Sequence, residues 1–162
     1  MRAVRKGMPE YQTNDHCSNC GEPVQRVKGN YLFRESGLSN IVLKNIEVMK
    51  CAHCGNQDPV IPRLTELIRF LAAAVVKQPC PLAGEQIRFL RKQLDKNGET
   101  FARLIGVDKT TLSKWENNQI SVGPNSDRLI RAVVLALGPE SKAELEKAVL
   151  GFTEIDDRRE SV

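Results

Sequence analysis

Residues 99–118, ETFARLIGVDKTTLSKWENN, give the clearest indication of fold in the second half of the chain. Apolar residues recur at helical spacing on both sides of Gly106, and a glycine there lets the backbone turn sharply. Ala102 is small enough for two helices to cross closely, and Asp108 is of a residue type that begins helices. The stretch therefore predicts two short helices joined by a tight glycine turn, which is a helix-turn-helix.

The second of these helices has polar side chains that suit contact with double-stranded DNA. In a helix-turn-helix, the first residues of the second helix face base edges in the major groove. Lysine can donate to guanine or to phosphate, and threonine can offer a hydroxyl or touch a thymine methyl group. An ordinary helical bundle with a solvated lysine face is the alternative. We expect DNA contacts, the last two with phosphate, from Lys109, Thr110, Thr111, Ser113, Lys114, Asn117 and Gln119.

Further helices flank this motif. Residues 64–77 have an amphipathic helical pattern, which the prolines at positions 79 and 81 end. Ser126 or Asp127 is the expected N-cap of a helix that follows the motif. Helical spacing predicts helices within residues 84–97, 125–138 and 139–152.

Two C-x2-C turns stand out in the first half, CSNCG at residues 17–21 and CAHCG at residues 51–55. Four thiolates give zinc a closed tetrahedral shell, and the glycine after each pair lets the backbone fold over the sulfurs. The expected ligands of one structural zinc ion per chain are Cys17, Cys20, Cys51 and Cys54. Reduced or disulfide-bonded turns are the alternative.

The segment between the cysteine pairs predicts about three short strands. Runs rich in Val, Ile, Leu and aromatic residues are PVQRV, NYLFRE and NIVLKNIEVMKC, with breaks at KGN (28–30) and ESGLSN (35–40). A domain of this size buries too little apolar surface to fold alone. The free energy of zinc binding is then expected to contribute to folding.

Composition and motif content argue against enzymes and membrane proteins. A zinc ion with four cysteine ligands has no open position for a catalytic water. The chain has two histidines, both beside the cysteine pairs, and no nucleophile constellation or phosphate-cradling loop, so we expect no enzymatic activity. No apolar run reaches the ~18 residues of a membrane span, and we expect a cytoplasmic protein.

Charge is unevenly spread along the chain. The formal net charge is +4. Residues 84–131 have nine Lys and Arg against six Asp and Glu, whereas residues 139–162 have four against seven. A basic middle and an acidic tail are compatible with binding to nucleic acid.

Residues 87–137 resemble the lambda-repressor, or Xre, type of helix-turn-helix. The residues that match its pattern are Arg91, Ala102, Gly106, Val107, Thr111, Leu112, Trp115 and Glu116. The resemblance implies an ion pair between Arg91 and Glu116 that joins the first helix of the domain to the third. Two positions depart from the pattern: Gly98 replaces the usual glutamine, and Asn118 replaces a glycine but tolerates the left-handed conformation.

The order of the motifs over residues 17–137 is similar to that of the MqsA-like zinc-finger antitoxins. Two cysteine knuckles 30 residues apart are followed by a helical linker and an Xre helix-turn-helix. The resemblance implies a homodimeric autorepressor that binds a palindromic operator, with a zinc domain that grips a toxin, usually an mRNA-cleaving ribonuclease. A stand-alone transcription factor without a toxin is the alternative, and an RNA-associated zinc ribbon is a third.

The expected fold class is α+β, with a small four-cysteine zinc-binding β domain before an all-α lambda-repressor-like domain. We expect dimer contacts from the helices around residues 127–152, although residues 145–152 could instead complete the core of the domain. The expected organisation is a flexible extension (1–16), the zinc-binding domain (17–62), a helical linker (63–82), the helix-turn-helix domain (83–153) and a tail (154–162).

Overall fold

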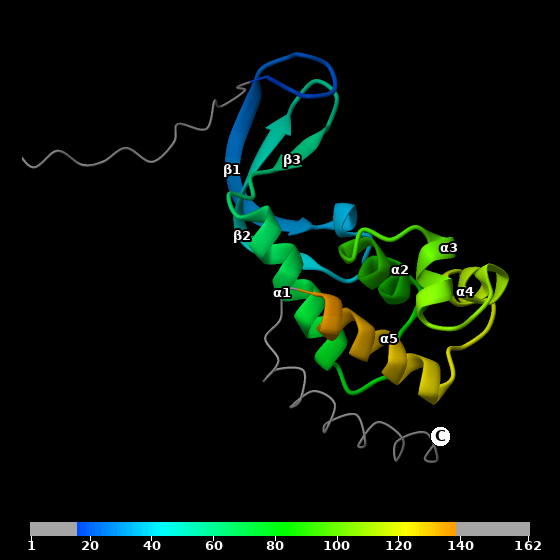
Figure 1. Cartoon of the computed structure of the whole chain (residues 1–162). Helices are drawn as coiled ribbons and strands as arrows, with labels where there is room; N and C mark the ends of the chain where they lie inside the picture. Colours follow the sequence, from blue (N-terminus) through cyan, green and yellow to red (C-terminus); the bar gives the residue numbers. More distant parts are fainter. Residues whose placement is uncertain (1–15, 139–162) are drawn as a thin grey trace, which may run out of the picture. The chain divides into compact units, whose positions relative to one another are not determined.

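The computed structural model describes residues 16–138, which form two compact units. Within this range, one unit holds residues 16–32 and 42–62, and the other holds residues 33–41 and 63–138 (Figure 1). A small antiparallel sheet with a cysteine cluster precedes five helices, so the α+β class is confirmed. The N-terminal extension, the helix expected at residues 139–152 and the tail lie outside the described residues.

The first unit is a three-stranded antiparallel sheet in the order β1-β2-β3. Its strands are β1 (Val24–Leu32), β2 (Val42–Cys51) and β3 (Gln57–Pro59). The pairing of β1 with β2 sets Val24 opposite Cys51, which places the second cysteine pair beside the residues that follow the first pair. Among the described residues of this unit, the buried apolar side chains are those of Cys17, Val48 and Cys51.

The break expected at residues 28–30 is wrong, because β1 runs through it as one strand. The pairing register instead shifts between Gly29 and Tyr31. On the partner strand Asn45 takes a left-handed φ of 53°, and its N–H donates to Oδ1 of Asn30 at 3.3 Å. A bulge of this kind absorbs an extra residue without ending the strand. The break expected at residues 35–40 does lie between strands.

The segment that joins β1 to β2 packs with the helices rather than with the sheet unit. Phe33 and Leu38 are buried, and a short 3-10 helix (Arg34–Ser36) lies between them. Ser39 donates from its N–H and its hydroxyl to the two carboxylate oxygens of Glu85, at 3.2 and 2.9 Å. The chain therefore passes between the two units three times, at residues 32–33, 41–42 and 62–63.

The second unit contains the five helices. They are α1 (Leu64–Lys77), α2 (Gly84–Gln93), α3 (Gly98–Leu104), α4 (Lys109–Glu116) and α5 (Pro124–Leu137). Gly106, with a φ of 71°, makes the turn between α3 and α4. The core is closely packed and includes Ile87, Leu90, Phe101, Leu112, Ile130 and Leu135. None of the helices within residues 16–138 has the length and apolar character needed to cross a membrane.

The start of α5 differs from the sequence-based expectation. Gly123 is the N-cap and Pro124 occupies the first turn, so the cap expected at Ser126 or Asp127 is wrong. Asp127 lies one turn inside the helix, where it is only 1% exposed. Its carboxylate accepts from the N–H of Leu82 at 2.7 Å and is paired with Arg131 at 2.6 Å.

Arg131 is fully buried and joins α5 to the end of α1. Its guanidinium donates to the carbonyl oxygens of Val76 and Gln78, at 2.7 and 2.8 Å, and to that of Cys80 at 2.7 Å. Carbonyls at the C-terminal end of a helix have no partner within that helix. Arg131 supplies those partners, so α1 and the proline-containing connection after it are held to α5 by a satisfied buried charge.

Candidate metal centre and DNA-binding face

The four cysteines come together at one end of the sheet. Sγ of Cys17 lies 3.5 Å from Sγ of Cys54, and Sγ of Cys20 lies 3.5 Å from Sγ of Cys51. All four sulfurs lie within 4.8 Å of one another. A disulfide would need about 2.05 Å, so the four residues are free thiols.

The two cysteine turns have the same backbone conformation. In each turn the N–H of the first cysteine donates to the carbonyl oxygen five positions on, at 2.7 Å from Cys17 and 2.9 Å from Cys51. The glycine after the second cysteine takes a left-handed φ, 76° at Gly21 and 74° at Gly55. This conformation is open to glycine and closes each turn over its two sulfurs.

The donor set fits a four-coordinate metal ion. Sulfur ligands about 2.3 Å from a tetrahedral ion lie about 3.8 Å from one another, close to the distances between the two turns. The N–H of Asn56 and the side chain of Asn19 lower the pKa of the Cys54 thiol to about 6, and the thiolate is the form that binds metal. The N–H of Glu22 also lowers the pKa of Cys20, but lost hydration and the neighbouring thiols raise it to about 12. A bound cation would offset the repulsion between thiolates.

Cys17, Cys20, Cys51 and Cys54 form a metal-binding cysteine cluster. The two histidines and Cys80 lie outside this cluster. Within residues 16–138, the grouped metal-ligand side chains are the four cysteines alone, without His16 or His53. Cys80 is an exposed thiol in the connection between α1 and α2.

We expect the C51S variant to lose the bound metal, because three thiolates and a hydroxyl bind a soft cation far more weakly. Cys80→Ser removes a thiol outside the cluster and is the matched control. Elemental analysis of both purified variants, with the wild-type chain, checks this. Wild-type metal content in C51S would contradict the assignment.

The start of α4 is held by Asp108. Its carboxylate accepts from the N–H of Thr111 at 2.8 Å and from the Thr111 hydroxyl at 2.5 Å. The hydroxyl bond first, and then the N–H bond, lower the pKa of Asp108 below its usual value. The Thr111 hydroxyl therefore stabilises the start of the helix. Thr111 is half-buried, whereas the other expected DNA contacts are exposed.

The exposed face of α4 carries the remaining expected contacts. Leu112 and Trp115 are buried, which fixes the side of α4 that faces the core. Lys109, Thr110, Ser113 and Lys114 are exposed.

Asn117 and Gln119 follow α4 and are also exposed. The amide nitrogen of Asn117 donates to the carbonyl oxygen of Ser113 at 2.8 Å, and its Oδ1 accepts from Arg88 at 2.7 Å. The side chain of Asn117 is thus already hydrogen-bonded within the protein.

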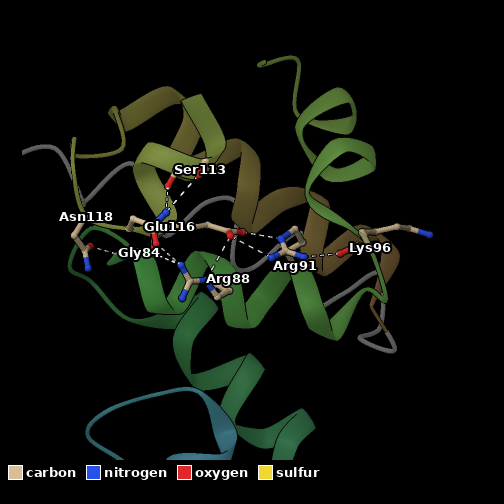
Figure 2. Close-up of polar contacts among 8 residues, drawn as sticks. Gly84, Arg88, Arg91, Lys96, Ser113, Glu116 and Asn118 are labelled. Atoms are coloured by element: carbon tan, nitrogen blue, oxygen red, sulfur yellow. Dashed lines mark hydrogen bonds and ion pairs between the residues drawn. The ribbon is translucent and has the colours of Figure 1, made fainter. Parts of the chain in front are cut away.

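An ion pair joins α2 to the end of α4 (Figure 2). Nε and Nη2 of Arg91 donate to the two carboxylate oxygens of Glu116, at 2.6 and 3.1 Å. Nη1 of Arg91 also donates to the carbonyl oxygen of Lys96, at 2.8 Å, in the connection to α3. Both side chains are mostly buried, at 13% and 10% exposed. A bidentate pair in this setting fixes direction as well as distance.

Gly84 lets the start of α2 touch the end of α4. A Cβ atom at this position would lie 2.3 Å from the carbonyl oxygen of Trp115 and 2.7 Å from that of Glu116. The N–H of Gly84 donates to Oδ1 of Asn118 at 2.8 Å, and Asn118 takes the left-handed φ of 54°. Asn118 thus combines the turn that ends α4 with a hydrogen bond to α2.

We expect Gly84→Ala to destabilise the protein by about 1–3 kcal/mol, because the added methyl group meets backbone atoms that cannot move aside cheaply. Gly98 is the matched control, since it begins α3 and an added Cβ meets nothing within 4 Å. Gly98→Ala should leave stability unchanged or raise it by up to about 1 kcal/mol. Urea denaturation of both variants measures the difference, and equal midpoints would argue against the close approach.

Comparison with known proteins agrees with this geometry. Residues 87–132 match the family model described as helix-turn-helix. No curated protein matches the chain. The second unit therefore contains a helix-turn-helix domain of the class found in DNA-binding transcription regulators.

Sequence reasoning missed the contacts of four residues that shape this domain. Gly84 and Arg88 lie within α2 but contact the end of α4, more than 25 positions away in the chain. Asp127 and Arg131 are four residues apart on α5. This spacing predicts an ion pair, but it does not predict that the pair is buried.

Proposed function

We propose that the protein is a sequence-specific DNA-binding repressor whose α4 enters the major groove. The observation that carries the proposal is the exposed polar face of α4, held rigidly on α2 by Arg91 and Glu116. A helix that presents lysine and hydroxyl side chains from a fixed backbone can discriminate between bases at little cost in conformational entropy.

The exposed residues divide into base and phosphate contacts. Lys109, Thr110, Ser113 and Lys114 contact base edges, since they lie on the free face of α4. Gln119, beyond the helix end, lies at the phosphate backbone. Thr111 holds the start of α4 through Asp108.

The cysteine cluster binds one structural zinc ion. Four thiolates fill a tetrahedral shell, and the small number of buried side chains in the sheet unit supports a role for the ion in folding. Zinc bound in this way supplies rigidity and no reactive position.

The chain acts as a homodimer on a palindromic operator, with half-sites about one DNA turn apart. The resemblance of the motif order to the MqsA-like antitoxins supports the further proposal that the sheet unit binds a toxin. The sheet forms a compact unit separate from the helix-turn-helix, so it can serve a partner of its own.

Lys114→Ala should weaken binding to the preferred operator by about 1–3 kcal/mol. Lys92→Ala removes the same charge from an exposed position on α2 and should have a smaller effect. Gel shifts on a duplex from the promoter of the gene, beside a scrambled duplex, give both affinities. Undiminished binding by the Lys114 variant would mean that another face contacts DNA.

Purification of the tagged full-length chain from its native host tests the antitoxin role. We expect a small ribonuclease to co-purify with it and to be inhibited by the complex. If no such partner binds and none is encoded beside the gene, the protein is a stand-alone regulator, and only the repressor half of the proposal survives.

A further inference from the structure

We propose that Arg88, on α2, is a phosphate contact of the DNA-binding face and that Asn117 positions it. This inference rests on the proposed DNA-binding function and adds a residue outside the helix-turn-helix stretch. Arg88 lies against Glu116, the last residue of α4 (Figure 2). It also bonds to Asn117, the residue that follows α4.

The guanidinium of Arg88 is held in place on one side. Nη2 donates to the carbonyl oxygen of Glu116 at 3.0 Å and to Oδ1 of Asn117 at 2.7 Å. Within residues 16–138, no group accepts a hydrogen bond from Nη1 of Arg88. Nη2 of the planar guanidinium is thus fixed, and Nη1 still has N–H groups that can donate to a ligand.

The positive charge of Arg88 is also in excess. The carboxylate of Glu116 already receives two hydrogen bonds from Arg91, at 2.6 and 3.1 Å, whereas Nε of Arg88 lies 3.5 Å from it. Two arginines and one carboxylate leave a net charge of +1. The Arg88 side chain is 42% exposed and that of Arg91 is 13% exposed, so the surplus charge faces solvent at Arg88.

Asn117 connects this charge to the exposed face of α4. Its amide nitrogen donates to the carbonyl oxygen and, at 3.4 Å, to the hydroxyl of Ser113, while its Oδ1 receives Nη2 of Arg88. The sequence suggested Asn117 as a phosphate contact. In this proposal Arg88 contacts the phosphate, and Asn117 positions Arg88. An anion beside Ser113 and the end of α4 would meet a pre-positioned guanidinium edge.

The salt dependence of DNA binding tests this inference. Each phosphate neutralised by the protein contributes about 0.9 to the slope of log affinity against log salt concentration. Fluorescence anisotropy of the metal-loaded full chain, on the promoter duplex and on a scrambled duplex over a potassium chloride series, measures that slope. We expect Arg88→Gln to lower the slope by about 0.9 and to weaken binding severalfold on both duplexes.

Two variants separate the charge from the fold. Arg63→Gln removes an exposed arginine at the start of α1 and should keep the wild-type slope. Arg88→Lys keeps the charge but loses the fork, and it should also keep the wild-type slope with a modestly weaker affinity. Thermal midpoints of all variants show whether each one folds.

The outcomes distinguish this inference from the proposed function. An unchanged slope in a folded Arg88→Gln protein overturns the phosphate contact. If that variant unfolds, Arg88→Met, which keeps the length of the side chain but also lacks the charge, is measured in its place, and an unchanged slope there overturns the contact. A slope lowered by about 0.9 in Arg88→Lys, despite the retained charge, would overturn it as well. A wild-type chain that binds both duplexes equally would refute sequence-specific repression, yet its salt slope would still test Arg88.

Discussion

The bidentate ion pair between Arg91 and Glu116 is the contact that fixes α4, the proposed DNA-binding helix, on α2. Glu116 is the last residue of α4 and is mostly buried, so its charge needs a cation beside it. Because Arg91 reaches both carboxylate oxygens and also the connection to α3, it sets the direction of α4 relative to α2 and α3. Gly84, at the start of α2, also contacts the end of α4, at a backbone distance that only a glycine allows. Its N–H bonds to Asn118, just after α4.

A second buried charge makes α1 part of the helical unit. Arg131 occupies the carbonyl oxygens at the end of α1, and Asp127 balances its charge and holds the N–H of Leu82. A helix that the sequence suggested as a linker is thereby anchored to α5, next to the start of α2. The joint has directional hydrogen bonds rather than apolar contacts alone, and such bonds specify one arrangement of the elements.

The sheet unit reaches stability by a different route. Few of its described side chains are buried, and two of the three buried apolar residues are the cysteines Cys17 and Cys51. The two turns share one backbone conformation, so each presents its sulfurs in the same way. We infer that a metal ion on the four sulfurs would contribute to the folding of the sheet unit, whereas the helical unit has an apolar core and two buried ion pairs.

Features that arise from neighbours along the chain could be predicted from residue order alone. The bounds of α1, the glycine turn at Gly106 and the two cysteine knuckles follow from local spacing and from residues with restricted or permissive backbones. Residue order did not predict that Arg88 lies against Asn117, that Arg131 reaches Val76 across 55 positions, or that the strand at Gly29 continues through a bulge. Those contacts join residues far apart in sequence, where the spacing of residue types contains no information on which partners will meet.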